Sequence, residues 1–544
     1  MAEELAFARK ASGLVRGLSM TDAFAVGFMN QGITPSVGLI FTTGLGVFLG
    51  ANLVLSAVIS FALAVIGFPI VWGVLGGSMP RSGGEYIYNS RIIHPIFGIA
   101  QSFGDAVIWL MWLYVLAPLI SEYGLSPMCS YLGWAGAADA LYNNNWLIFV
   151  VASVFNVVGF LFVVFGIKIF ALAQKVVMFF SIGGAIVIGL VFTFTSKADF
   201  IANWNEAATA TGSFDYNTFI TQISAAAETT IPTSWSWEPT IGTMAVMSWL
   251  FAYAYSISFI AGEVKRPDKT IIWANVFSII VPFAFMLWFG LVIQRTTGYE
   301  FIQAASWMDN NGAIDGYNMP FATDFISVGV YCLGAGSAAL GAFGKILASW
   351  MALSYIGFTL WWLALSYLAF PRILFAWGMD RMGPKWFTDI NPRFASPVKN
   401  HVLCFVLSEI LLLIYMLGSF DVMQNLVVTG LQVTSVFLPT AIAALLFPYM
   451  KRCRGIWDSS PYKSWSFLGL PVVVWGALVD IAYLALLLYA FIGLDAMGPL
   501  FDTAGYVLFV GAWVAGAAWY LFWRQRSKSV GVDVSMTYGE LPPE

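Results

Sequence analysis

The chain has 544 residues, of which 59% are hydrophobic and only 10% are charged, and its formal net charge is −4. Ordinary soluble domains are about 45–50% apolar and about 25% charged, so this composition excludes a soluble globular protein. Many segments of about 20 residues carry almost no charge, and this is the length of a helix that spans a bilayer. The four cysteines and two histidines are scattered along the chain, which indicates neither a disulfide framework nor a metal site.

Hydropathy predicts twelve membrane-spanning helices. They cover residues 19–45, 47–75, 96–124, 146–166, 168–195, 239–263, 270–294, 342–371, 401–418, 423–448, 467–492 and 500–523. A further apolar stretch, 323–344, is either an extracellular helical loop packed on the bundle or a thirteenth span.

The basic residues decide between these two topologies. With twelve spans and a cytoplasmic N-terminus, only Lys197, Arg295 and Lys345 of the 25 basic residues fall outside the cell. Cytoplasmic loops carry the excess of Lys and Arg, whereas a thirteenth span would place the basic cluster at 372–399 outside. We therefore expect a multi-pass plasma-membrane protein with both termini in the cytoplasm. Basic residues spread over many inner loops reflect topology and do not indicate nucleic-acid binding.

The first span, Thr21–Phe41, is interrupted in its middle by Gln31-Gly-Ile-Thr-Pro-Ser36. Pro35 has no N–H and clashes with the carbonyl four residues back, so the carbonyl of Gln31 loses its helical partner. At membrane depth such a group is tolerated only where it is buried in protein or lines a wet cavity. The stretch therefore either lines a binding cavity or is a proline kink without a ligand.

The sixth span offers a counterpart at Met247–Gly262. Two interrupted spans at matching places in two halves indicate an inverted-repeat transporter, with its site at mid-membrane. The expected organisation is a cytoplasmic tail (1–18), a first five-helix repeat (19–195), an extracellular loop (196–238), a second repeat (239–448), two added helices (467–523) and a second cytoplasmic tail (524–544). The expected fold class is an all-α polytopic membrane protein with a 5+5 inverted repeat.

Two motifs carry a family resemblance. The loop from Met79-Pro-Arg-Ser-Gly-Gly-Glu-Tyr to Gly98 and the ending Gly262-Glu-Val-Lys-Arg-Pro267 resemble those of amino acid–polyamine–organocation (APC) transporters. The resemblance implies a LeuT-type fold and transport of amino acids or related amines by alternating access, with spans 1, 2, 6 and 7 moving against spans 3, 4, 8 and 9. It also implies that the break in span 1 binds the substrate carboxylate and the break in span 6 binds its amino group, in accord with the helix dipole.

The substrate-binding residues expected on this basis are Gln31, Gly32, Ile33, Thr34, Pro35, Ser36, Phe251, Ala252, Tyr253, Ala254, Tyr255, Ser256 and Trp109. The sequence departs from the family pattern at both breaks. The usual Gly-x-Gly falls on Ile33-Thr34-Pro35, where Pro35 cannot donate, and Gly32 is an alternative flexible point. In span 6 the usual glycine is absent from 252–256.

A third departure concerns ion coupling. Ser181 stands where several proton-coupled members carry a lysine, so coupling through that residue is not expected. The Ser181 hydroxyl with Ser349 or Ser354 would suit a sodium ion, since hard cations prefer oxygen ligands. Transport or exchange without an ion is the other alternative, and no cofactor beyond a coupling cation, sodium or proton, is expected.

The remaining candidates have plainer interpretations. Asp105 in span 3 is expected to pair with Arg81 or Arg91 of the neighbouring loop, although an intramembrane charge is a functional suspect. Trp109 and Trp112 would wall a pocket or simply pack. Two other classes compete with a transporter: a sensor of the same fold that does not transport, and a membrane enzyme, for which no catalytic cluster is apparent. A neutral or apolar amino acid is the expected substrate, and the oligomeric state is not indicated.

Overall fold

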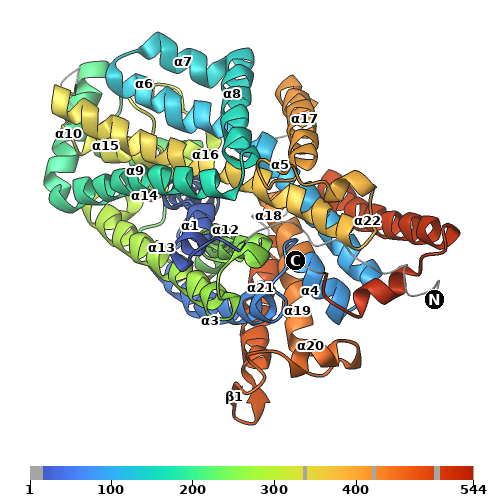
Figure 1. Ribbon diagram of the computed structural model, residues 1–544. Helices are drawn as coiled ribbons and strands as arrows, with labels where there is room; N and C mark the ends of the chain where they lie inside the picture. Colours follow the sequence, from blue (N-terminus) through green and yellow to red (C-terminus); the bar gives the residue numbers. More distant parts are fainter. Residues whose placement is uncertain (1–15, 335–339, 420–423, 495–502, 543–544) are drawn as a thin grey trace.

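The computed structural model describes residues 16–334, 340–419, 424–494 and 503–542, and its regular structure is helical apart from one two-stranded hairpin (Figure 1). Twelve of the described helical segments are long and apolar enough to cross a membrane. The predicted all-α polytopic fold and the number of spans are therefore confirmed. Residues 1–15 of the predicted N-terminal tail, and the first residues of the predicted tenth and twelfth spans, lie outside the described residues.

The twelve spans are built from α1 (Met20–Gln31), α2 (Ile33–Leu39) and η2 (Ile40–Leu45); α3 (Leu53–Ser78); α5 (Pro95–Leu119), η3 (Ile120–Leu125) and α6 (Ser126–Leu132); α8 (Asn145–Val164); α9 (Ile167–Phe194); α12 (Trp237–Phe251) and η4 (Ala252–Glu263); α13 (Pro267–Thr297); α16 (Ala342–Met379); α17 (Val398–Ile414) and η6 (Tyr415–Ser419); α18 (Gln424–Gln432), η7 (Val433–Phe437) and α19 (Leu438–Leu446); α21 (Val472–Ile492); and α22 (Thr503–Ser529). The shorter elements are α4 (Glu85–Ile92), α7 (Ala135–Asn143), α10 (Lys197–Thr211), α11 (Tyr216–Ala226), α14 (Tyr299–Asn311), α15 (Phe325–Tyr331), η5 (Lys385–Thr388), η8 (Lys451–Cys453), α20 (Arg454–Asp458), η10 (Val534–Tyr538), β1 (Ser466–Phe467) and β2 (Leu470–Pro471).

Five predicted span boundaries are wrong by more than a turn. One is the end of span 12, where the helix continues to Ser529 instead of ending at residue 523. Span 2 begins late because the Asn52 side chain accepts a hydrogen bond from the Leu55 N–H at 3.0 Å and caps α3. Span 3 continues to Leu132 through a π-helical turn, and span 8 continues to Met379. Span 11 begins only at Val472, because the β1–β2 hairpin occupies the residues before it.

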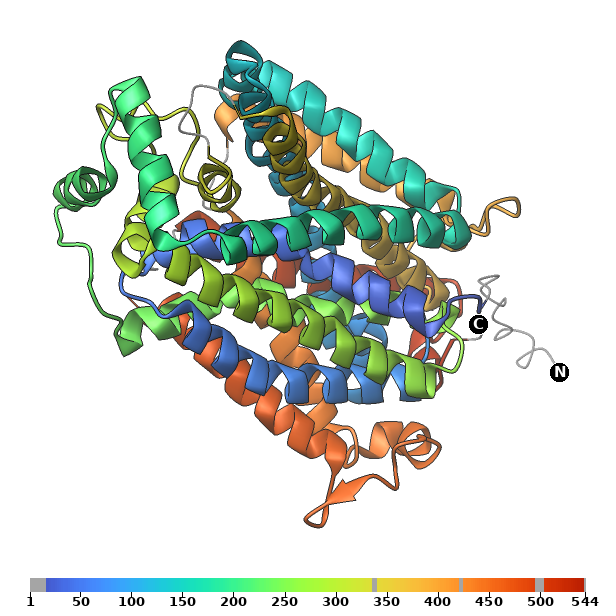
Figure 2. The same ribbon diagram turned by 90° about the vertical axis from the view of Figure 1, so that its left-hand side faces the viewer.

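Both described ends of the chain lie at one end of the bundle, and α10 and α11 lie at the opposite end (Figure 2). We call these the terminal face and the lid face. The stretch that competed as a thirteenth span contains α15, which has only seven residues. At 1.5 Å per residue it is about 10 Å long, too short to cross a membrane. Residues 335–339 of the stretch lie outside the described residues, and the described part is a loop with one short helix, not a thirteenth span.

The first and sixth spans form the centre of the bundle. In the 18-residue apolar stretch that identifies each span, 100% of the residues are buried in span 6 and 83% in span 1, compared with 22% in span 9 and 17% in span 12. The α1 helix packs directly on η4 and α13. Span 3 is also 83% buried, so the two interrupted spans are among the three that are most enclosed by protein.

The lid face is covered by the helices of the two long loops, which pack around aromatic rings. The Phe301 ring of α14 lies 4.8 Å from Trp204 of α10 and 5.0 Å from Tyr216 of α11, between ring centroids. Trp204 also lies 4.7 Å from Tyr331 of α15. These contacts join the loop helices into one cap over the lid face.

The described part of the predicted C-terminal tail (524–542) packs on the helical bundle. The α22 helix continues to Ser529, and η10 then returns to the terminal face, where Tyr538 is 1% exposed. The Arg91 guanidinium lies 5.2 Å from the Tyr538 ring and forms a buried ion pair with Asp380 at 2.7 Å. The chain end therefore packs on the loops that follow spans 2 and 8.

Candidate functional site

Span 1 is broken at Gly32. This residue has φ 51° and ψ 77°, a left-handed conformation that glycine adopts without steric cost. It separates α1 from α2, and a Cβ atom at this position would lie 2.6 Å from the Trp362 indole. Gly32, and not the Ile33-Thr34-Pro35 segment, is therefore the point at which the helix opens.

The α2 helix starts at the break without a side-chain cap. The first N–H groups of a helix have no intrahelical partner, so those of Ile33 and Thr34 face the break, while Pro35 has none. The carbonyl of Gln31 does not remain unpaired as predicted, because the Ser36 hydroxyl donates to it at 2.5 Å. The hydroxyl that was expected to contact a ligand thus replaces the hydrogen bond that Pro35 removes.

Span 6 changes helix type where we expected it to unwind. The α12 helix ends at Phe251, and residues Ala252–Glu263 continue as a 3₁₀ helix. The break in span 6 that the resemblance implies is thus a change of helix type: without a glycine at 252–256, the chain tightens to i→i+3 hydrogen bonds. The Tyr253 carbonyl accepts a hydrogen bond from the Asn30 Nδ2 atom at 2.9 Å. This bond joins the two discontinuities.

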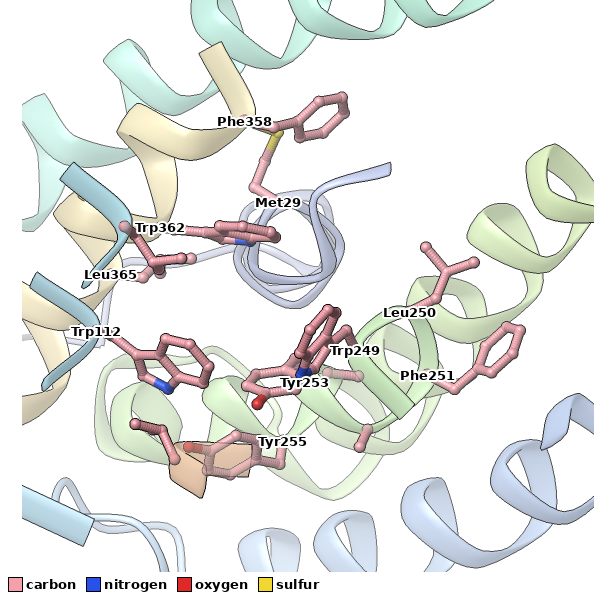
Figure 3. Packing of buried hydrophobic residues seen from close by; sticks show 14 of the residues in the cluster. Met29, Trp112, Trp249, Leu250, Phe251, Tyr253, Tyr255, Phe358, Trp362 and Leu365 are labelled. Carbon is pink, nitrogen blue, oxygen red and sulfur yellow. The ribbon is translucent and has the colours of Figure 1, made fainter. Parts of the chain in front are cut away.

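A small cavity lies beside both discontinuities. Its volume is about 30 Å³, room for about two water molecules. Aromatic rings from spans 3, 6 and 8 converge on it (Figure 3). The cavity is lined by Asn30, Leu39, Trp109, Trp112, Leu116, Trp249, Tyr253, Trp362 and Ser366, none of which is charged.

Two of the thirteen expected site residues, Trp109 and Tyr253, line this cavity. Phe251 points away from it (Figure 3), and its ring lies 6.4 Å from that of Phe61. Tyr255 lies behind the lining, with its ring stacked 6.1 Å from Trp109. The others are buried without lining the cavity: Gln31, Gly32, Ile33, Thr34, Pro35, Ser36, Ala252, Ala254 and Ser256.

The sequence prediction missed Trp249 and Trp362. Tryptophan is typical of the membrane–water interfaces, so its occurrence in the middle of span 8, at Trp362, was an available signal. The indole covers the Gly32 break, and its N–H has no hydrogen-bond partner in the described part of the chain.

Several other buried polar atoms at the site also lack partners among the described residues. They include the Trp112 indole N–H and both amide atoms of the Gln31 side chain, which is 0% exposed. Buried polar groups are normally hydrogen-bonded. Donors and acceptors next to the break are thus available to a polar ligand.

The proposed sodium ligands are only partly brought together. The Ser354 hydroxyl donates to the Ser181 carbonyl at 2.6 Å and is hydrogen-bonded to the Thr34 hydroxyl at 2.6 Å. Ser349 lies five residues earlier in α16, about 7.5 Å along the helix axis, and does not belong to this group. The Ser181 hydroxyl is buried and has no partner among the described residues.

Two ion pairs join the central spans to their neighbours at the terminal face. The Glu263 carboxylate at the end of span 6 accepts from the Nε and an Nη atom of Arg372 in span 8 at 2.9 and 2.7 Å. Asp22 at the start of span 1 pairs with Lys175 of span 5 at 2.7 Å. Spans 1 and 6 are thus held against spans 5 and 8 on this face.

Asp105 does not make the predicted ion pair. Arg91 is bound to Asp380 instead, and Arg81 donates to the carbonyl of Pro542 near the chain end. The Asp105 side chain is 1% exposed, and its Oδ1 atom has no hydrogen-bond partner in the described part of the chain.

A second cavity of about 120 Å³ lies toward the lid face, and the carboxyl groups of Glu122, Asp309 and Asp324 contribute to its lining. Burial, followed by the nearby Asp324, raises the pKa of Asp309 to about 8. The Thr42 hydroxyl of span 1 donates to Asp309. The half of span 1 nearer the lid face is thus joined to the cap over that face.

A comparison with known families agrees with this geometry. A family model described as amino acid permease matches residues 18–510, from just before span 1 into span 12. No curated protein matches the chain. The match covers most of the chain and confirms the resemblance to APC transporters. The chain therefore belongs to the amino acid permease family, and it is a multi-pass membrane protein of amino acid transport rather than an enzyme.

Proposed function

We propose that the protein carries a neutral amino acid with an apolar side chain across the membrane by alternating access. The observation that carries this proposal is the Gly32 break, which opens beside an uncharged cavity walled by aromatic rings. The substrate would lie between the two discontinuities of spans 1 and 6.

Each part of such a substrate has a matching group in the site. The free N–H groups at the start of α2 suit a carboxylate, because a helix N-terminus presents donors and positive dipole ends. The faces of Trp112, Trp249 and Trp362 suit an ammonium group through cation–π attraction and also suit an apolar side chain. A charged side chain would find no counter-ion, since none of the described residues that line the cavity is charged.

The cavity volume supports a conformational cycle. About 30 Å³ holds about two waters, so a substrate enters only when the tryptophan rings and their helices separate. The Glu263–Arg372 and Asp22–Lys175 pairs close the terminal face in this conformation. Alternating access requires them to open when the lid face closes.

We also propose that the terminal face is cytoplasmic and that the protein lies in the plasma membrane. The basis is the concentration of basic residues in loops assigned to that side. Cleavage of an epitope tag at residue 544 by an external protease, in permeabilised cells but not in intact ones, would support this orientation. Cleavage in intact cells would reverse it.

Sodium is a candidate coupling ion. One observation favours it: the buried Ser181 hydroxyl lacks a partner among the described residues. The Thr34 and Ser354 hydroxyls, however, are hydrogen-bonded to each other and need no ion. Sodium-dependent uptake that is lost in Ser181→Ala would support the sodium site.

The proposed function is tested with purified protein in liposomes. A panel of amino acids and amines is first screened for thermal stabilisation, since a bound ligand stabilises the folded state by mass action. Uptake of the best radiolabelled ligand is then measured. Trp362→Ala is expected to abolish uptake, and Trp273→Ala, at a position 52% exposed, is the matched control. Ligand binding without flux in wild-type protein would instead identify a sensor.

A further inference from the structure

A second group of buried polar side chains lies next to the aromatic cavity, on the side of the terminal face. Its centre is Glu85, the first residue of α4, which is 0% exposed. The Glu85 Oε1 atom accepts from the Trp72 indole at 2.5 Å and from the Ser258 hydroxyl at 2.9 Å. Its Oε2 atom has no donor among the described residues.

Asp105 of span 3 is the second carboxyl group of this cluster and interacts electrostatically with Glu85. Glu85 acts on Asp105, and both carboxyls act on the phenol of Tyr255, as does the neighbouring Tyr253. No lysine, arginine or histidine of the described chain acts on the two carboxyls. Two ionised carboxylates would therefore repel each other in a buried site without compensation.

A third buried acceptor, on Gln432, also lacks a hydrogen-bond donor among the described residues. The Gln432 side chain is 0% exposed and donates through Nε2 to the Tyr255 hydroxyl, which leaves its Oε1 atom without a donor. One side-chain oxygen in each residue, Glu85 Oε2, Asp105 Oδ1 and Gln432 Oε1, thus lacks a donor among the described residues. A proton on a carboxyl group supplies a donor and removes one buried charge at the same time.

We infer that Glu85 and Asp105 form a proton-binding site that couples amino acid transport to protons; this inference rests on the proposed function. One carboxylate oxygen forms an O–H bond with a proton taken up from water on one side of the membrane. The same bond breaks when the proton is released to water on the other side. The site changes by one charge, and no other reactant is needed.

The location of the pair explains how protonation would be linked to substrate. Asp105 lies four residues, about one helical turn, before Trp109, which lines the cavity. Glu85 is held by Trp72 of span 2 and Ser258 of span 6, whereas Asp105 belongs to span 3. The pair thus bridges the two groups of spans that the proposed cycle moves apart: repulsion separates them when both carboxyls are ionised, and one proton lets them close.

Burial raises the pKa of Glu85 to about 7, which agrees with proton exchange near neutral pH. A metal ion is a less suitable occupant. Among the described residues, no group of three or more acidic, thiol or imidazole side chains is arranged to hold one.

The inference is tested in liposomes with radiolabelled leucine as the probe and an inward pH gradient of one unit. One proton per substrate supports about a tenfold accumulation, because one pH unit corresponds to about 1.4 kcal/mol. Glu85→Gln and Asp105→Asn are expected to reduce accumulation to the level without a gradient. Glu409→Gln is the matched control. This half-buried carboxylate accepts from Ser153 and Asn156, and its substitution should leave accumulation unchanged.

A second measurement does not depend on the substrate. Infrared difference spectra between pH 5 and pH 9 should show a protonated carboxyl band that is lost in Glu85→Gln or Asp105→Asn but kept in Glu409→Gln. Absence of this band in wild-type protein, or accumulation driven by sodium alone, would overturn the inference. If wild-type protein gives the band but transports no leucine, the proposed function fails and the proton site stands.

Discussion

The ion pair between Glu263 and Arg372 offers the sharpest test of how the terminal face is closed. Substitution of Glu263 by Gln keeps the size of the side chain and removes its charge. Arg372 then keeps only a neutral amide and the Leu368 carbonyl, to which it donates at 3.1 Å. Because the Arg372 side chain is only 6% exposed, water cannot solvate the guanidinium in place of the lost carboxylate.

The structure sets the size of the effect. Removal of one partner of a buried ion pair costs about 3–5 kcal/mol, and the exposed fractions of 6% and 2% place this pair in that class. The pair joins span 6 to span 8, so the cost falls on the conformation in which these spans touch. Since 1.4 kcal/mol is a factor of ten, the closed terminal face should lose a factor of at least about a hundred relative to the open one.

Thiol labelling from the terminal face measures this shift. Ser366 lines the aromatic cavity and is 1% exposed, so a thiol introduced by Ser366→Cys is protected while the face is closed. In Glu263→Gln the same thiol should react with a water-soluble reagent at least tenfold faster. The native cysteines are buried or half-buried, and their labelling without Ser366→Cys gives the background.

The matched control is the pair between Asp389 and Lys399, whose side chains are 50% and 63% exposed. Exposed pairs contribute about 0–1 kcal/mol, so Asp389→Asn should not change labelling at position 366. Equal labelling rates in Glu263→Gln, Asp389→Asn and the parent protein would refute the view that the buried pair closes this face.

Three further predictions follow from the same geometry. Gly32→Ala should lower the melting temperature and abolish uptake. Gly212 has a similar φ of +67°, but no atom lies within 4 Å of a Cβ built there, so Gly212→Ala should lower the melting temperature only slightly. Equal effects of the two substitutions would exclude the close contact with the Trp362 indole as the cause. The pKa of Glu85 rises from 4.5 to about 7 on folding, so the folded state binds more protons and the melting temperature should fall as pH rises from 4.5 to about 7. Glu85→Gln should flatten this dependence of melting temperature on pH, and parallel curves in both proteins would contradict the role of Glu85. Glu263→Gln removes the ion pair at the end of η4 and should let this segment relax from 3₁₀ to α geometry, which shortens it by about 5 Å. Spin labels at positions 237 and 266 should therefore come closer together in this variant. An unchanged distance between the labels would show that the segment stays 3₁₀.

The number of spans and the place of the first break were accessible from the sequence because both signals are local. A run of apolar residues is sufficient to identify a span, and Gly32 interrupts the helix through its own stereochemistry, whereas Pro35 lies within α2. The same reasoning failed in span 6, where no residue marks the start of the 3₁₀ helix. There the Tyr253 carbonyl is bound by Asn30, 223 residues away in sequence.

The lining of the cavity was hidden for a different reason. A helix that is apolar on every side has no period that tells which face is buried. A tryptophan in the middle of span 8 is unusual, but the helical pattern alone does not predict that Trp362 faces Gly32 instead of lipid. Ion pairing was equally ambiguous: Arg91 is near Asp105 in the chain, yet it binds Asp380, 289 residues away. Competition among distant partners is decided by tertiary packing and cannot be read from neighbouring residues.

The 3₁₀ segment of span 6 connects three features that the sequence presents separately. Tyr253, near its start, lines the aromatic cavity; Ser258 donates to Glu85; and Glu263, at its end, binds Arg372. At about 2.0 Å per residue the segment extends about 20 Å from the cavity to the terminal face. Runs of 3₁₀ helix longer than three or four residues are uncommon and frequently mark hinges. One 3₁₀ segment thus contacts the aromatic cavity, Glu85 and Arg372, so a change of its helix type would alter all three contacts together.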